Sequence, residues 1–358
     1  MDAGKMNLDI LQSRTIDWLR YPLMVLIVFY HTDTSLLLSM PHNGASMILY
    51  QILRTIMHVA VPLFFIFSGY LFFRQPEHFT GKVYREKLVR RIRTLLIPYL
   101  IWNFFALVVT GGITISSLRP DIFIDNFVGI GEGFCGMPKA FQLWYLRDLM
   151  VMCLLSLPLY YLLRGRRPWL LLLFAFLYVY QWTYRVHPII YRFPSALLFF
   201  SIGAYMGIHK MNIIETVRRI PLWASLTLTS LIMIAHIWLI ITGSPDYIYA
   251  EMLFAIVAVI PTLQIASLLV ERRNLSPIAW LAGSTFLLYA VHPLIINYFI
   301  VVPFEGKLPC TTFYFWIVLF AEVVTPVLLC AAIHAAATHF MPRTAALLSG
   351  GRVKPRNN

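Results

Sequence analysis

Long apolar runs separated by short basic clusters fill most of the chain. A membrane-spanning helix needs about 20 apolar residues, and ten runs reach or approach that length. These runs cover residues 18–40, 48–73, 94–116, 143–163, 168–182, 195–209, 222–242, 250–270, 277–300 and 312–338. The pattern predicts an all-α integral membrane protein, a bundle of about ten transmembrane helices.

The basic clusters predict the orientation of this bundle. Cytoplasmic loops of membrane proteins carry an excess of Lys and Arg. If the N-terminus is cytoplasmic, 22 of the 29 Lys and Arg residues fall on the cytoplasmic side and 7 on the other. We therefore expect both termini in the cytoplasm, a single transmembrane domain over residues 1–342 and a short basic cytoplasmic tail over residues 343–358.

Composition excludes most other classes of protein. Hydrophobic residues make up 59% of the 358 residues and charged residues 13%, whereas a soluble domain carries roughly 25% charged residues. The net charge of +13 lies in clusters between apolar runs, so it indicates topology and not nucleic acid binding. The N-terminus does not have the form of a cleaved secretory signal.

The four cysteines lack the spacing of a structural metal site, and we expect no metal. Cys135 and Cys310 fall on the outer side of the predicted topology. They either form a disulfide in an oxidising compartment or remain two free thiols, because sequence gives no distance between them.

Ionisable side chains within apolar runs are the main functional candidates, because charge in hydrocarbon is costly. His31 lies deep in the first run, and Arg20 precedes it by eleven residues, three helical turns, on the same face. Asp17 shares that face as well, Arg14 precedes it and Asp33 follows His31. A cytosolic charge and a deep base on one helix face would suit a pocket open to the cytosol.

Other candidates each have a plain structural alternative. His58, His292 and Glu322 lie at a depth similar to that of His31, and the two histidines could equally be packed side chains bonded to a neighbouring helix. Ser68 and Gly69 would allow close approach of a ligand or of another helix.

Two charged motifs flank the membrane runs. Arg90 and Arg93 are either topology anchors or an anion-binding pair, since arginine forks bind phosphate. Arg147 and Asp148 enter the membrane beside Trp144. Adjacent residues on a helix do not face each other, so we expect Arg147 and Asp148 to have different partners.

These features together resemble the membrane-bound acyltransferase-3 family. The resemblance rests on "RTIDWLRYPLMVLIVFYH", which holds Arg20 and His31, and on an Arg-x-x-Arg before "IPY". It also rests on "PLFFIFSGYL", "LWYLRDL" and "STFLLYAVHPL". The motifs occur in family order over about residues 14 to 300, and we expect no additional periplasmic domain of the kind that some members carry.

The resemblance implies a function and a set of site residues. Many relatives O-acetylate sugars with acetyl-CoA, so the chain is expected to be a stand-alone O-acyltransferase of the bacterial cytoplasmic membrane. Acyl-CoA would be a co-substrate, with no bound cofactor, and a glycan or lipid-linked sugar the acceptor. His31 would be catalytic with Arg20 and Asp17. The donor would be bound by Arg90, Arg93, Ser68, Gly69 and Arg14, with Tyr289 and His292 in less defined roles.

The chemistry of these residues is consistent with that activity. Acyl transfer to a hydroxyl needs a base, and a histidine in an apolar site stays neutral. Transfer could be direct or pass through an acyl-histidine. A transporter or flippase would also place such residues in a helical bundle, but it would often show inverted repeats, and we find none. A structural membrane subunit is a third hypothesis, in which His31 has no chemical role.

Overall fold

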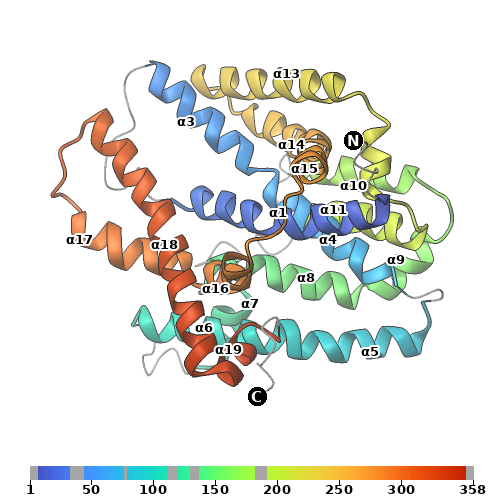
Figure 1. The fold of residues 1–358 in the computed structure, drawn as a ribbon, viewed down its shortest axis with the longest axis horizontal. Helices are drawn as coiled ribbons and strands as arrows, with labels where there is room; N and C mark the ends of the chain where they lie inside the picture. The colour runs from blue at the N-terminus through green and yellow to red at the C-terminus, as the bar shows by residue number, and fades with distance from the viewer. Residues whose placement is uncertain are drawn as a thin grey trace. The chain divides into compact units, whose positions relative to one another are not determined.

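A computed structural model describes residues 7–32, 44–75, 79–111, 119–129, 137–181 and 192–351. Every regular element in these ranges is a helix (Figure 1). The prediction of an all-α protein is therefore confirmed for the described part of the chain.

Six helical runs among the described residues are long and apolar enough to cross a membrane. They are Gly44–Phe73, Gly81–Val109, Leu222–Ile241, Tyr247–Arg273, Ala279–Phe304 and Thr312–Phe340. Two further helices are α8 (Trp144–Leu154), which follows the 3₁₀ turn Phe141–Leu143, and α9 (Ser156–Leu163). The chain bends by 61° between them, and they make a seventh span if they cross the membrane together. The chain is thus a multi-pass membrane protein.

Three of the ten predicted spans are either too short or too rich in charged residues to be counted with these runs. The apolar helices α10 (Trp169–Tyr180) and α11 (Phe193–Ile208) are shorter than 18 residues. The first helix, α1 (Leu8–Tyr30), carries charged residues along its first half. The full number of ten spans, and the side on which each terminus lies, stay predictions.

Most of the long runs consist of two or three helical segments. Gly44–Phe73 contains α3 (Gly44–Met57) and α4 (Ala60–Phe73), and Tyr247–Arg273 contains α14 (Tyr247–Val257) and α15 (Val259–Arg273). Gly81–Val109 passes from α5 (Gly81–Arg91) through a π-helical turn (Ile92–Leu96) into α6 (Ile97–Val109). Ala279–Phe304 contains α16 (Ala279–Ile296), a second π-helical turn (Asn297–Val301) and α17 (Val302–Phe304).

Two helices begin earlier than the apolar pattern predicted. The first, expected over 18–40, runs over Leu8–Tyr30, and the third, expected from residue 94, begins at Gly81. The apolar pattern placed these two starts directly after charged residues, Asp17 and Arg93, whereas side-chain caps set them. Asn7 accepts a hydrogen bond from the Asp9 amide and Thr80 accepts one from the Val83 amide.

The chain folds as two compact units, each built from two separate stretches of sequence. Unit 1 comprises residues 1–64 and 211–332, and unit 2 comprises residues 65–210 and 333–358. In unit 1, α1 packs against α3, α15 and α16, and α13 (Leu222–Ile241) lies along α14 (Figure 1). Unit 1 also contains α12 (Ile213–Arg218) and most of α18 (Thr312–Phe340).

Unit 2 is built around α11, which packs against α8, α9 and α10. It also holds α7 (Pro120–Val128), which contacts α6. The predicted tail begins inside α19 (Pro342–Leu348), which also lies against α6, and the Trp102 indole donates a hydrogen bond to the Leu348 carbonyl at 3.1 Å. The first part of the tail is therefore folded onto unit 2.

Candidate functional site

His31 lies at the C-terminal cap of α1, and not in the middle of a helix as expected. Its ring meets the ring of His292 edge to face, with centroids 5.2 Å apart. The Nδ1 atom of His31 lies 3.4 Å from the Ile27 carbonyl oxygen, an acceptor. This contact favours hydrogen on Nδ1, so Nε2 is the nitrogen that carries the lone pair.

His292 is fully buried on α16, and its neighbours define its tautomer. The Nδ1 atom lies 2.9 Å from the Leu288 carbonyl oxygen and 3.1 Å from that of Tyr289, so it carries the hydrogen. Its Nε2 atom has no hydrogen-bond partner among the described residues. A buried polar atom of this kind is costly in a purely structural residue, which points to a functional role beside His31.

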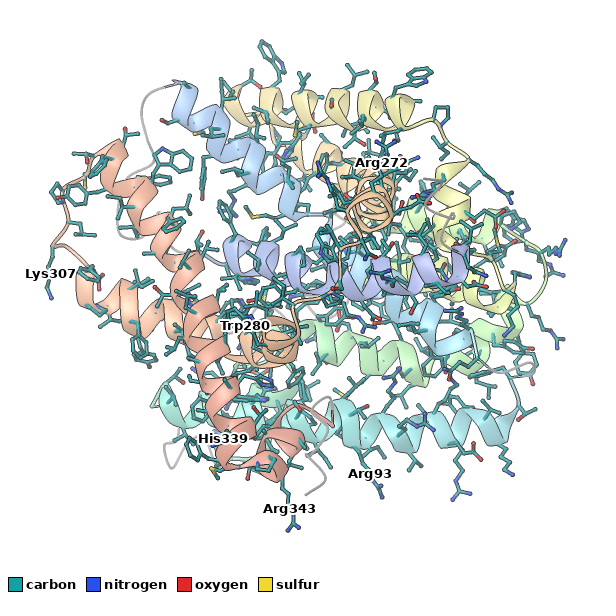
Figure 2. All side chains as sticks on the ribbon, viewed as in Figure 1. Arg93, Arg272, Trp280, Lys307, His339 and Arg343 are labelled. Carbon is teal, nitrogen blue, oxygen red and sulfur yellow. The ribbon has the colours of Figure 1, made fainter. Side chains whose placement is uncertain are left out.

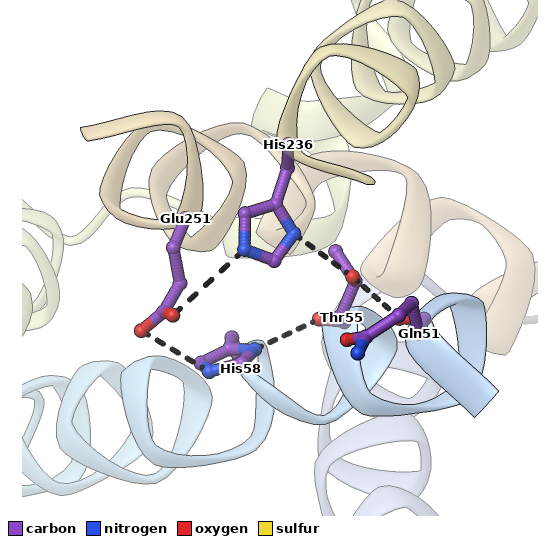
Figure 3. A network of polar contacts seen from close by, with 5 residues as sticks. All are labelled: Gln51, Thr55, His58, His236 and Glu251. Atoms are coloured by element: carbon purple, nitrogen blue, oxygen red, sulfur yellow. Dashed lines mark hydrogen bonds and ion pairs between the residues drawn. The ribbon is translucent and has the colours of Figure 1, made fainter. Parts of the chain in front are cut away.

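Tyr30 joins this histidine pair to a second polar cluster in unit 1. Its ring lies 5.3 Å from that of His31 and 5.4 Å from that of His58, centroid to centroid. His58 occupies the break between α3 and α4 and contacts Glu251 on α14, with Nε2 to Oε1 at 3.1 Å (Figure 3). The break in the helix thus turns a histidine toward a carboxylate on another helix.

The cluster continues to α13 through His236 and Thr55 (Figure 3). The Thr55 hydroxyl donates to the Gln51 carbonyl at 2.7 Å, so it accepts the hydrogen of His236 Nδ1 at 3.0 Å. His236 Nε2 lies 3.9 Å from Oε2 of Glu251. Two histidines on different helices therefore face the two oxygens of one carboxylate. Among the described residues, no group of three His, Cys, Asp or Glu side chains could hold a metal ion.

A cavity of about 430 Å³ opens beside this cluster, and we call it the α3–α14 cavity. The described residues that line it all belong to unit 1: Tyr30, Gln51, Arg54, His58, His236, Ile240, Gly243, Tyr247 and Glu251. Arg54 donates a hydrogen bond to the Tyr50 hydroxyl at 3.0 Å, and its guanidinium carbon lies 5.4 Å from the Tyr30 ring centroid.

The other predicted residues of α1 do not meet His31. Arg20 and Asp17 form an ion pair of 2.9 Å with each other, and both are about half exposed. Eleven helical residues place Arg20 about 16 Å from His31 along the axis. Arg14 contacts the Asn274 and Leu275 carbonyls just beyond α15, at 3.4 and 3.3 Å. This contact ties α1 to α15, so Arg14 has a structural partner whatever else it binds.

Arg90 and Arg93 are exposed at the junction of α5 and the first π-helical turn, in unit 2. Figure 2 shows Arg93 projecting away from the ribbon. Lys87 and Arg91 on the same stretch face inward, over the ring of Phe72 at 4.8 and 5.7 Å. The basic run thus has an inner pair that packs and an outer pair that can meet an anion.

Gly69 lies at a close crossing of α4 and α11, where helix packing explains it fully. A Cβ atom added at Gly69 would lie 2.1 Å from the Phe200 carbonyl oxygen, and one at Gly203 would lie 1.9 Å from that of Ile66. Close approach of another helix, one of the two alternatives for Gly69, is therefore what the structure shows, and a bulky residue there would push the two helices apart. The neighbouring Ser68 shares a hydrogen bond of 2.9 Å with the hydroxyl of Tyr145.

Arg147 and Asp148 pair with each other, contrary to the expectation of different partners. Nε of Arg147 lies 2.8 Å from Oδ1 of Asp148, and both side chains are buried. The long arginine side chain bends back along the helix, and its terminal nitrogen also donates to the Val128 carbonyl at 2.8 Å. Trp144 is buried beneath Arg192, whose guanidinium carbon lies 4.5 Å from its ring centroid.

The remaining predicted residues fall into two groups. Tyr289 on α16 and Glu322 on α18 are buried in unit 1, and the Tyr289 carbonyl helps to hold His292. Asp33 and Cys135 lie outside the described residues, so neither the role of Asp33 nor the pairing of Cys135 with the exposed Cys310 is tested.

Sequence reasoning missed three members of the polar cluster. The apolar and charge patterns gave no functional assignment to Arg54, His236 or Glu251. Glu251 did carry a signal, since it is an acidic residue at the start of an apolar run, "YAEMLFAIV".

Comparison with known proteins identifies the family. The sequence model of the acyltransferase-3 family, described as an acyltransferase domain, matches residues 14–335. The chain belongs to the acyltransferase-3 family. This membership favours acyl transfer, which requires a donor and an acceptor, over the transporter hypothesis.

One similar protein has a name that states its biological setting. The chain is 28% identical over 314 residues to the succinoglycan biosynthesis protein ExoH of Rhizobium meliloti (strain 1021), covering 84% of this chain and 80% of the relative. No solved structure matches the chain significantly. The relative is thus linked by its name to the synthesis of an exopolysaccharide.

Proposed function

We propose that this protein is an O-acyltransferase of the bacterial cytoplasmic membrane that moves an acyl group, acetyl in the first instance, from acyl-CoA to a hydroxyl of a glycan or lipid-linked sugar. The observation that carries the proposal is the pair of His31 and His292 within an acyltransferase-3 domain. The relative's link to exopolysaccharide biosynthesis supports a glycan acceptor.

In this proposal His31 is the general base. Its Nε2 atom takes the proton of the acceptor hydroxyl while the hydroxyl oxygen attacks the thioester carbonyl carbon. The carbon–sulfur bond then breaks, the coenzyme A sulfur takes up the proton from His31, and the products are an ester and free coenzyme A. A first transfer to His31 would give the same products through an acyl-histidine.

His292 acts as a positioning residue for this base. Its fixed tautomer and complete burial hold one rigid ring against the imidazole of His31, so they restrict the direction in which Nε2 of His31 points. Precise placement of a base contributes to the rate because misplacement by about 1 Å can cost 100-fold.

The donor is expected to bind from the cytosol through Arg90 and Arg93, whose guanidinium groups suit the phosphates of coenzyme A. Both are exposed, as such a role requires. With the termini in the cytoplasm, the acceptor would be acylated at or beyond the opposite face of the membrane.

The test is a sealed-vesicle assay with radiolabelled acetyl-CoA on one side only. Acylation of glycan enclosed on the opposite side, with release of coenzyme A, is the expected result, and the His31→Ala variant should give neither. If donor and acceptor must share one face, transfer across the membrane is wrong. If no acyl-CoA is consumed with any glycan fraction of the source envelope, the acyltransferase proposal is wrong.

A further inference from the structure

The walls of the α3–α14 cavity are built for a polar, uncharged ligand. Arg54 supplies a positive charge and Glu251 a negative one, and His58 and His236 add imidazole groups. Among the described residues that line it, Ile240 has the only aliphatic side chain. An alkyl chain would find little apolar surface there. A pyrophosphate would meet the carboxylate of Glu251 in the same lining, and that negative charge repels an anion.

Groups that combine donors, acceptors and aromatic rings suit a sugar. A sugar hydroxyl both donates and accepts, so it can bond to a carboxylate, a guanidinium or an amide in one orientation. Tyr30 and Tyr247 add phenol rings to the same lining. The volume of about 430 Å³ lies within the range of pockets that bind small ligands, roughly 300–1,000 Å³.

The position of the cavity links it to the base. Tyr30 lines it, and the ring of Tyr30 contacts the ring of His31, the next residue, at 5.3 Å. On its other side the same ring contacts His58 at 5.4 Å. A ligand in the cavity is therefore separated from His31 by one aromatic side chain.

We propose that the α3–α14 cavity binds one neutral sugar residue of the acceptor, held by Arg54 and Glu251, with the hydroxyl that becomes acylated directed past Tyr30 toward His31. This assignment rests on the proposed function for its role in catalysis, but the binding itself does not. Glu251 is positioned for this task by its contacts with His58 and His236 on two other helices.

Binding is tested first without catalysis. The probes are p-nitrophenyl β-D-glucopyranoside and β-D-galactopyranoside, and the measurement is thermal unfolding of the purified protein with each. At least one glycoside should raise the melting temperature of the wild type and of the inactive His31→Ala variant. Ile240→Phe, which places an aromatic ring in the lining, and Glu251→Gln should abolish this shift.

The matched control is Glu271→Gln. Glu271 is also in an ion pair within unit 1, with Arg218 at 2.9 Å, and its exposure of 27% is close to the 31% of Glu251. This variant should keep the glycoside response. Tyr247→Phe removes a single hydroxyl from the lining and provides a mild second variant if Glu251→Gln fails to fold.

The kinetic arm separates this proposal from the proposed function. With acetyl-CoA as donor, Glu251→Gln should raise the KM for the glycoside at least tenfold, and Tyr247→Phe should raise it at least threefold. The KM for acetyl-CoA should stay within twofold of the wild-type value in both variants. Transfer that proceeds with unchanged glycoside KM in both variants overturns the cavity assignment and leaves the acyltransferase intact. A third result is possible, in which the glycoside raises the melting temperature of the wild type but not of the cavity variants, and no acyl transfer is detected. That result supports the sugar site and contradicts the proposed function.

Two further outcomes also overturn the assignment. The first is that neither glycoside stabilises the wild type. The second is that inorganic pyrophosphate stabilises the wild type and loses its effect in Ile240→Phe, which would make the cavity an anion site.

Discussion

The imidazole rings of His31 and His292 meet edge to face, with centroids 5.2 Å apart and an interplanar angle of 82°. The two residues are 261 positions apart in sequence, and the packing of α1 on α16 brings them together. We expect His292→Phe, which keeps a ring of similar size, to lower kcat by about 10–100-fold through a misdirected base. The KM values should change little, since no substrate contact is lost.

A purely structural His292 would behave differently. In that case His292→Phe would leave kcat and its pH profile unchanged, whatever the loss of the Nδ1 hydrogen bonds does to the melting temperature. Measuring kcat, its pH profile and the melting temperature on the same preparation distinguishes the two roles.

His31→Ala should abolish acyl transfer while the protein still inserts and folds. His31 lies at the end of α1 and is only partly buried, so the truncation removes few contacts. Acyl incorporation and membrane abundance should be measured together, and turnover near that of the wild type would refute the role of His31 as base.

Arg90→Ala combined with Arg93→Ala should raise the KM for acyl-CoA by about tenfold or more with a smaller effect on kcat. Arg85→Ala is the matched control, because Arg85 is exposed on the same basic helix. An equal effect of Arg85→Ala would indicate a diffuse charge effect, and an unchanged KM in the double variant would make both arginines topology anchors.

Gly69→Ala and Gly203→Ala should each destabilise unit 2, by about 1–3 kcal/mol if the helices shift apart. The added Cβ atoms would lie 2.1 and 1.9 Å from carbonyl oxygens of the facing helix. Gly81→Ala is the control, since no heavy atom lies within 4 Å of its added Cβ. The melting temperature in detergent is the measurement, and equal values for all three variants would contradict the close crossing.

Asp148→Asn should destabilise the protein strongly, by about 3 kcal/mol or more, because it leaves the buried Arg147 without its carboxylate. Asp121→Asn, in the exposed pair with Arg119 of 2.9 Å, should have no measurable effect. Similar melting temperatures for Asp148→Asn and the wild type would show that Arg147 is satisfied without this ion pair.

Local sequence determined the class of the protein and most of its helices. Apolar runs of about 20 residues have few alternatives to helix in a membrane, since every backbone group must be bonded within the segment. The same reasoning selected His31 and His292 as candidates, because ionisable side chains in such runs are rare. Helix ends were less predictable, as α1 shows, because the cap at Asn7 and not the change in hydropathy sets where that helix begins.

Only the tertiary structure decided which candidates act together. His58, His236 and Glu251 lie on α3–α4, α13 and α14, and the hydrogen bond from His236 to Thr55 spans 181 residues. No local pattern encodes such contacts, because they depend on how the helices pack in three dimensions. The pairing of Arg147 with Asp148 has the same origin, since burial leaves the two charges no water and the long arginine side chain bends back to its neighbour. The packing of α1 on α16 likewise brings His292 to His31. The sequence of α1 predicted only that His31 shares a helix face with Arg20.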